Sequence, residues 1–274
     1  MSKRRKSGKV APVVRALLFA AYGIPIVWIV LTSLKTSNQV FNKGWSMVFF
    51  TPNITAFTKN LQGPLFDAAL QSVTIATGTC LLVLLIAVPA GYGLARTTGR
   101  VPTFALAMLI VLQMVPQTAT VIPLFQVFGN WGLLDTTIGV IIADTALLTP
   151  FAVLLLRPFF RGVPVALEES GAIDGASVWR IFRSIVLPIA RNGIATTATL
   201  IFLIAWGEFL YSVNFFLSPG RYPLSAVLAQ QVTAFGIDWP GLMALSVLTS
   251  IPILILFVVT YKQLRDGLTV GAVK

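Results

Sequence analysis

Six long stretches of the sequence carry few or no charged residues, and they constrain the fold more than any other feature. A helix needs about 20 mainly apolar residues to cross the hydrocarbon core of a bilayer. Backbone groups without an internal hydrogen bond find no partner in lipid, so each stretch must be helical. The sequence therefore predicts an all-α, polytopic membrane protein with about six transmembrane helices. The expected spans are approximately residues 14–34, 69–95, 102–124, 137–157, 193–217 and 240–261.

The composition agrees with a lipid environment and removes several classes of chemistry. Hydrophobic residues make up 56% of the 274 residues and charged residues only 11%, whereas soluble domains carry about 25% charged residues. The chain has no histidine, which excludes histidine-based triads, metal sites and proton shuttles. A single cysteine, Cys80, excludes a disulfide framework within the chain. The first apolar stretch is too long for a cleavable signal peptide.

Lysine and arginine residues are distributed unequally between the two sides that the spans define. Sixteen of the 20 lie on one side, and four (Lys35, Lys43, Lys59 and Arg221) lie on the other. Because cytoplasmic loops are enriched in these residues, we expect both termini in the cytoplasm. The net charge of +11 is explained by this topology, and we expect no nucleic-acid partner.

The third span contains residues that interrupt helices. Pro116, Gln117 and Pro123 lie within an uncharged run that continues to Leu134. Proline removes a backbone donor and disfavours the helical conformation of the residue before it. We therefore expect the third membrane helix to end or bend here.

The segment between the fourth and fifth spans, residues 158–191, is too long for a simple turn. Pro164 suits a first helical turn, and the sequence Asp174-Gly175 is a strong turn signal. Ser177 suits the N-cap of a second helix, in which Val178, Ile181, Phe182 and Ile185 share one face, and Leu187-Pro188 closes the unit. The sequence predicts an amphipathic helix–turn–helix at the cytoplasmic face.

Such an element either docks on another protein or lies on the lipid surface. A lipid-bound helix is typically basic, whereas this one carries Glu168 and Glu169 in its first half. Small side chains in the same segment permit close backbone approach, which favours contact with a protein. They are Ser170, Gly171, Ala172, Gly175 and Ala176.

The segment resembles the "EAA" loop of binding-protein-dependent ABC importer permeases, in particular the carbohydrate-uptake group. That group usually has Glu-Ala-Ala-x-x-Asp-Gly-Ala, and the chain has ESGAIDGAS at residues 169–177. The whole chain is similar to the maltose-system G-type permease subunit. Further matching segments, in order, are LTSLK (31–35), AGYGLAR (90–96), MVP (114–116), IPLF (122–125), WGEFL (206–210) and GLTVGAVK (267–274).

The resemblance implies a single importer transmembrane domain over residues 1–274 and a coupling role for the cytoplasmic loop. Two departures from the usual motifs are Ser170-Gly171 in place of Ala-Ala, and Trp206-Gly207-Glu208 in place of Trp-Asn-Glu/Asp. The first lowers helix propensity, and the second weakens the transfer of substrate contacts. The residues implied to contact the ATPase subunit are Glu168, Glu169, Ser170, Gly171, Asp174, Gly175 and Ala176.

The resemblance also implies the partners. It predicts a second homologous permease subunit, two copies of an ABC ATPase and an extracytoplasmic solute-binding protein, in the inner membrane of a prokaryote. The chain has no phosphate-binding loop of the form GxxxxGK[ST], so it is expected to be a non-enzymatic subunit. We expect no cofactor on this chain, and ATP and Mg on the partner ATPase. The implied substrate is a disaccharide, an oligosaccharide, or a related polyol or sugar-phosphate.

Polar residues inside the spans are candidates for the substrate pathway, because ionisable groups in membranes usually face a cavity or a partner. The candidates are Glu208, Asp144, Gln113, Tyr211 and Asn214. A structural hydrogen bond to a neighbouring helix, or a position near the outer interface, is the alternative interpretation for both acids.

Two other functional classes compete with the importer permease. An ion-coupled secondary transporter would use Asp144 and Glu208 as carriers, but we find no inverted repeat that would support it. A membrane-embedded enzyme is not supported, because nine acids and no histidine provide few side chains for a catalytic centre.

Overall fold

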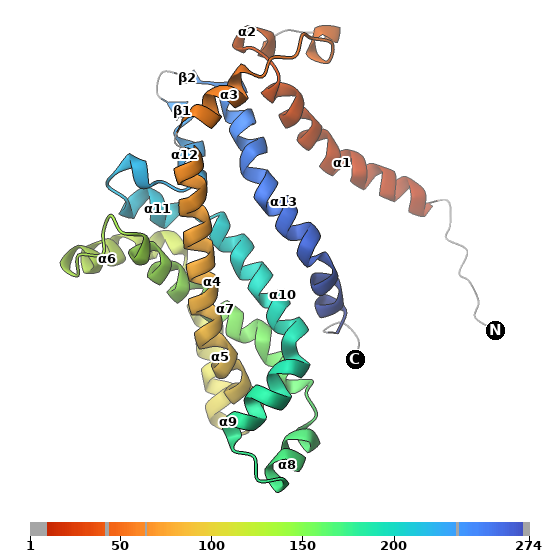
Figure 1. Cartoon of the computed structure of the whole chain (residues 1–274), viewed down its shortest axis with the longest axis vertical. Helices are drawn as coiled ribbons and strands as arrows, with labels where there is room; N and C mark the ends of the chain where they lie inside the picture. Colours follow the sequence, from red (N-terminus) through yellow and green to blue (C-terminus); the bar gives the residue numbers. More distant parts are fainter. Residues whose placement is uncertain (1–9, 42–43, 64, 234–235, 271–274) are drawn as a thin grey trace. The chain divides into compact units, whose positions relative to one another are not determined.

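The structure is a computed structural model that describes residues 10–41, 44–63, 65–233 and 236–270 (Figure 1). Regular structure in these residues is helical apart from one hairpin of two short strands, which confirms the predicted α class. The chain divides into two compact units. The first contains Met1–Phe66 and Leu228–Ile251, and the second contains Asp67–Val227 and Pro252–Lys274.

The first unit combines one long helix with short elements that join its two chain segments. Asn60 Nδ2 donates a hydrogen bond to the Gly241 carbonyl oxygen at 3.1 Å. In the hairpin, Val232 lies opposite Ile237 in antiparallel register. The elements are α1 (Val10–Ser33), α2 (Ser37–Val40), η1 (Gly44–Met47), α3 (Thr55–Gln62), β1 (Val232–Thr233), β2 (Gly236–Ile237) and the start of α13 (Trp239–Val270).

The second unit contains the long helices that pack against each other and the loop between them. In order, they are α4 (Leu65–Arg96), α5 (Arg100–Gln113), α6 (Gln117–Asn130), α7 (Thr137–Arg161), α8 (Val165–Ile173), α9 (Val178–Ile181), η2 (Phe182–Val186), α10 (Leu187–Trp206), α11 (Leu210–Phe215), η3 (Pro219–Arg221) and α12 (Leu224–Ala229). Buried side chains from α4, α6, α7 and α11 form its core cluster.

Among the described residues, five helical segments are long and apolar enough to cross a membrane, and a bent pair makes a sixth. The five are Pro12–Ser33, Leu65–Arg96, Thr137–Arg161, Val178–Trp206 and Trp239–Tyr261. The prediction of about six transmembrane helices is therefore confirmed.

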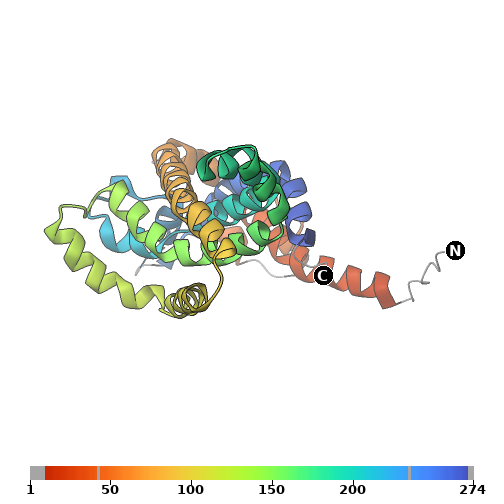
Figure 2. The same ribbon diagram turned by 90° about the horizontal axis from the view of Figure 1, so that it is seen from below.

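The third span is broken, as the proline residues predict. Helix α5 ends at Gln113 and α6 starts at Gln117, and the two axes differ by 91°. Figure 2 shows α5 nearly end-on while α6 runs lengthwise. The expected end or bend of the third membrane helix is therefore confirmed. Pro116 lies at the break in an extended conformation (ψ 135°), where it cannot continue the helix of α5.

The fifth span begins earlier and ends earlier than the expected 193–217. Leu187-Pro188 does not close the preceding unit, because helical structure continues from Val178 to Trp206. A wider π-helical segment, η2, directly precedes Pro188, where the proline has no N–H to donate. The helix then stops at Gly207 and resumes as α11, so the expected span is interrupted near its far end.

Close approach of the long helices depends on glycine at the contacts. A Cβ atom on Gly193 of α10 would lie 2.2 Å from the Phe159 ring of α7. A Cβ atom on Gly91 of α4 would lie 3.2 Å from Leu156 Cβ, also on α7. Small residues at such crossings let helix backbones pack closely in membranes. Helix α7 is thus held between α4 and α10 in this unit.

Candidate functional site

The loop between α7 and α10 contains the predicted helix, turn and second helix. Helix α8 follows Pro164 and ends at Asp174, and Gly175 adopts a left-handed conformation with φ +80°. Ser177 caps the next helix by accepting a hydrogen bond from the Arg180 N–H at 3.4 Å. The turn predicted at Asp174-Gly175 and the N-cap predicted at Ser177 are therefore both present. The second helix, however, is continuous with α10.

Gly171 brings α8 close to the helix that follows it. Gly171 is buried, and a Cβ atom there would lie 2.9 Å from Ile185 Cδ1 and 3.3 Å from Ile181 Cγ1. The glycine that replaces the usual alanine of the motif thus shortens the distance between α8 and the α9–η2 segment. Its cost in helix propensity is about 1 kcal/mol.

The exposed surface of the loop combines acidic and large apolar side chains. Glu169 and Asp174 are exposed, and the side chains of Ile173 and Trp179 are 86% and 66% exposed. Of the residues predicted to share one face of the second helix, Val178 is exposed, whereas Ile181 and Phe182 are buried. Sequence reasoning missed Ile173 and Trp179 as surface residues, although large apolar side chains beside charged ones were the available signal.

Glu168 differs from the other acids of the loop, because it is bound within the chain. Its carboxylate accepts hydrogen bonds from Arg96 Nε at 2.8 Å and from Tyr92 Oη at 2.7 Å, and it contacts Arg96 Nη2. Arg96 Nη2 also donates to the Val163 carbonyl at 3.0 Å. The Arg96 and Glu168 side chains are 18% and 12% exposed. Glu168 therefore ties α8 to the end of α4, and its geometry favours a positioning role over a partner contact.

A second polar group lies where α10 stops and α11 begins. Glu208 is 7% exposed, and its carboxylate accepts the Tyr211 N–H at 2.6 Å and the Ser212 N–H at 3.0 Å. The Ser212 hydroxyl donates to the same carboxylate. These groups belong to the first turn of α11, whose N–H groups have no partner within the helix. This geometry supports the structural interpretation of Glu208 that the sequence left open.

Asp144 lies in the first half of α7 and shares a cavity with Glu208. The residue is 2% exposed, and its Oδ2 atom has no hydrogen-bond partner in the described part of the chain. The cavity measures about 310 Å³, and Gln117 and Gly207 also line it. Side chains that are 64 residues apart in the sequence thus meet at one polar space.

The three remaining pathway candidates do not line this cavity. Tyr211 is buried, its hydroxyl lies 2.7 Å from Thr120 Oγ1, and it lines a separate, mainly apolar cavity of about 360 Å³. Gln113 is exposed and donates to the Leu147 carbonyl at 3.1 Å. Asn214 is exposed and donates to the Leu210 carbonyl at 2.6 Å. The five predicted residues therefore do not form one site.

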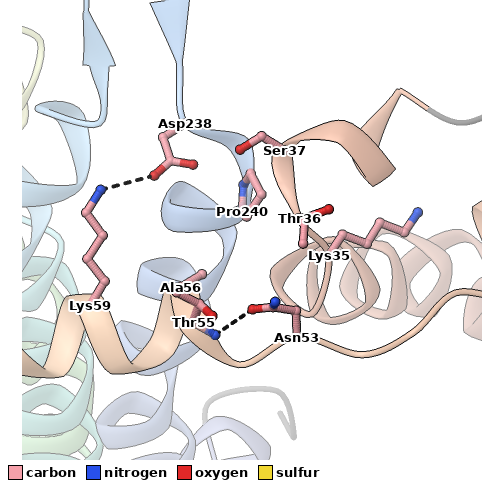
Figure 3. Close-up of a pocket in the computed structure, with 9 residues that line it drawn as sticks. All are labelled: Lys35, Thr36, Ser37, Asn53, Thr55, Ala56, Lys59, Asp238 and Pro240. Atoms are coloured by element: carbon pink, nitrogen blue, oxygen red, sulfur yellow. Dashed lines mark hydrogen bonds and ion pairs between the residues drawn. The ribbon is translucent and has the colours of Figure 1, made fainter.

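The first unit has its own polar pocket of about 240 Å³ (Figure 3). Lys59 Nζ lies 3.8 Å from Asp238 Oδ2 across it. Lys35 lines the pocket, but Figure 3 shows its side chain directed away from that ion pair. The Lys35 ammonium donates to the Met47 carbonyl at 2.7 Å and lies about 5 Å from the Trp28 and Phe50 rings. The last residue of the 31–35 segment thus has a structural role that its sequence did not reveal.

The family of the chain follows from a match to a family model. The model "Binding-protein-dependent transport system inner membrane component" matches residues 87–269, which include α8 and both broken spans. The chain belongs to this family. The match covers most of the second unit, including Arg96, Glu168, Asp144 and Glu208.

Relatives and solved structures agree with this assignment. The sulfoquinovosyl glycerol transport system permease SmoH of Agrobacterium fabrum is 29% identical over 270 residues, covering 98% of this chain and 95% of the relative. The trehalose transport system permease SugB of Mycobacterium tuberculosis is 28% identical, covering 92% of each. A chain of a bacterial ABC transporter involved in the import of the acidic polysaccharide alginate shares the fold, with a TM-score of 0.78 at 20% identity, covering 96% of this chain and 99% of that chain.

Family membership determines the general role. The permease is a multi-pass inner-membrane subunit of a bacterial ABC importer, and it is a transport component, not an enzyme. Such importers contain a separate ATPase, a permease partner and a substrate-binding protein. An ion-coupled secondary transporter, considered from the sequence, is not favoured.

Proposed function

We propose that this permease forms half of the translocation pathway for a sugar, either a di- or oligosaccharide or a related polyol or sugar-phosphate. Support comes from the relatives, which carry names of trehalose and sulfoquinovosyl glycerol systems. In this proposal the chain pairs with one homologous permease and two ATPase copies, and both of its units belong to one transmembrane domain. ATP and Mg are bound by the ATPase partner.

We further propose that α8 docks on the ATPase and transmits its movement. The observation that carries this proposal is the contrast between the two sides of α8. One side presents exposed Glu169, Ile173 and Asp174, while the other side is fixed to α4 through Glu168 and to the α9–η2 segment through Gly171. A short helix held in this way passes a tilt to two spans at once, as rigid-body switching requires.

The coupling proposal is tested in the reconstituted importer with Glu169→Lys and Ile173→Glu. Both changes lie on the exposed side of α8, and we expect each to reduce substrate-stimulated ATPase activity and sugar uptake at least tenfold. Thr98→Lys introduces a lysine at an exposed position outside α8 and should leave both activities close to wild type. Wild-type assembly and stimulation in both α8 variants would show that this face does not contact the ATPase.

The membrane orientation is a separate part of the proposal. We propose that both termini and α8 face the cytoplasm, on the basis of the sixteen-to-four distribution of lysine and arginine. Cys80 is the only cysteine, so a Cys80→Ala background allows single-cysteine labelling. In intact cells a membrane-impermeant thiol reagent should label Trp45→Cys and not Thr98→Cys, and the reverse pattern would invert the topology.

Pathway contacts are proposed for the exposed amides Gln113 and Asn214, whose side chains are accessible in the described chain. We expect Asn214→Ala to raise the sugar concentration for half-maximal uptake several-fold without changing the amount of assembled importer. Unchanged uptake kinetics would remove Asn214 from the pathway. Asp144 and Glu208 are buried, and their geometry supports a different ligand.

A further inference from the structure

The cavity between α6, α7 and the α10–α11 break contains two acids and no described basic residue. Asp144 and Glu208 line it together with the Gln117 side chain, and the rest of the wall is apolar or backbone. The ion pairs among the described residues are Lys59–Asp238, Arg96–Glu168 and Arg221–Asp135, none of which involves these acids. A buried charge without a partner is costly, so buried acids are normally paired or hold a cation.

Hydrogen bonds fix the position of Glu208 in this pair. Its carboxylate accepts two backbone N–H groups and one hydroxyl. These bonds hold the carboxyl group in place on the wall of the cavity.

Asp144 supplies a second oxygen donor that the protein leaves unused. Its Oδ2 atom is buried and has no partner among the described residues, although more than nine-tenths of the residue is buried. Native structures rarely leave such an atom unpaired without an ion, a water molecule or a function to explain it. The atom belongs to a residue that lines the cavity, so the Asp144 side chain lies beside any ligand bound there.

The break in the fifth span adds a third feature that favours a cation. Helix α10 ends at Trp206, and residues of its last turn, Ile204 and Ala205, line the cavity. The C-terminal end of a helix carries a partial negative charge and favours cations. Discontinuous membrane helices in transporters use such ends to coordinate small cations. The two carboxyl groups and the end of α10 thus all favour a cation in the cavity.

We propose that this cavity binds a monovalent cation, with the carboxyl groups of Asp144 and Glu208 as oxygen ligands. The volume of about 310 Å³ accommodates a partly hydrated ion and is far larger than a shared proton requires. A divalent ion is disfavoured, because Ca²⁺ takes six to eight oxygen ligands, usually several carboxylates, and no group of three potential metal-ligating side chains occurs in the described residues. The cation stabilises the broken span, and this role does not depend on the identity of the sugar.

The test measures cation binding by the purified complete importer in detergent. Thermal unfolding is recorded in NaCl or KCl, titrated against choline chloride at constant ionic strength, and binding of radioactive sodium is measured by equilibrium dialysis. We expect a saturable rise in the unfolding temperature with one inorganic cation. A ligand that binds only the folded state has this effect. Asp144→Asn should raise the half-saturating concentration at least tenfold or abolish the rise.

The control is Asp67→Asn, which removes an exposed acid from the first turn of α4. It should keep the wild-type cation response. Equal unfolding temperatures in all salts, or the same response in wild type and Asp144→Asn, would overturn the proposal. So would stabilisation by neutral sugars at this site with no effect of the cation, because the occupant would then be a polyol. Loss of sugar transport with an intact cation response would instead refute only the proposed function.

Discussion

Two places in the second unit bury acidic side chains, and the chain treats them in opposite ways. At α8, Glu168 is neutralised by Arg96 and also accepts the Tyr92 hydroxyl, so all the charge is balanced within the protein. At the α10–α11 break, Asp144 and Glu208 share a cavity in which no described basic residue lies. Compensated charge fixes the position of one element relative to another, whereas uncompensated charge creates a place for a ligand. The comparison predicts that an acid's loss of its partner strongly destabilises the protein at α8, whereas substitution of Asp144 at the α10–α11 break hardly changes stability.

The largest effect is expected at Arg96. Arg96→Ala leaves the buried Glu168 carboxylate without its cation, and breaking a buried pair in this way costs about 3–5 kcal/mol. We expect a lower unfolding temperature and nearly complete loss of coupled ATPase activity. Arg100→Ala, at an exposed position four residues later, is the matched control and should be close to wild type.

A charge swap separates the pair from its individual residues. Arg96→Glu combined with Glu168→Arg should recover part of the stability and coupling lost in each single variant. Equal losses in Arg96→Ala and Arg100→Ala, or no recovery in the swap, would show that the pair does not hold α8.

An intermediate effect is expected at Glu208. Glu208→Ala removes the acceptor for two N–H groups and a hydroxyl in the first turn of α11, which should cost about 2 kcal/mol. Glu208→Asp keeps the charge on a shorter side chain and should recover part of this loss. Hydrogen exchange at the amides of Tyr211 and Ser212 would measure the effect locally. Unchanged protection in Glu208→Ala would contradict the capping role.

A much smaller effect is expected at Asp144 in choline buffer, where no small cation is present. Asp144→Asn changes a carboxyl group whose Oδ2 atom has no hydrogen-bond partner among the described residues, so the change in stability should stay within about 0.5 kcal/mol. The difference between the stability changes of Asp144→Asn and Arg96→Ala is the most direct test of the comparison. A loss of several kcal/mol in choline would mean that Asp144 has an internal partner and that the two regions are alike.

The sequence predicted the positions of the spans and the loop because these depend on local patterns. Uncharged length located the helices, Pro116 located the bend, and Asp174-Gly175 located the turn. Contacts between distant segments left no such pattern. Arg96 and Glu168 are 72 residues apart, and nothing in either local sequence indicates the other as its partner.

The details of the fifth span also could not be predicted from local patterns. The sequence Leu187-Pro188 is typical of a helix end, but helical structure continues through it after the π segment that precedes the proline. Glu208 followed by Ser212 four residues later was a usable signal for a capping interaction, because a helical turn brings these positions together. Hydropathy alone placed the same residues within a continuous membrane helix.

A third acid, Asp135, has a side chain that is 28% exposed, more than Glu168, and provides a reference for this comparison. It lies in the connection before α7, and its carboxylate accepts the Ser218 hydroxyl at 2.8 Å and the N–H groups of Leu217 and Ser218 at 3.0 and 3.1 Å. The Ser218 hydroxyl, followed by these N–H groups and the Arg221 charge, lowers the pKa of Asp135. A lowered pKa in the folded state means that the group stabilises the protein above its unfolded pKa of about 3.9. This contribution is lost as the pH falls through the lower folded value.

The smallest effect is therefore expected for Asp135→Asn, measured as stability against pH. Asparagine also tolerates the left-handed conformation of residue 135, with φ 55°, so the backbone should be unchanged. The variant should lose a little stability at pH 7 and become less sensitive than wild type to acid below about pH 4. Since Asp135 is at the surface, added salt should reduce the difference, whereas the Arg96→Ala difference should persist because that pair is largely buried. Equal salt sensitivity in the two variants would mean that the difference in burial between Asp135 and Arg96 has no effect on stability. Charge pairing alone would then distinguish the regions compared.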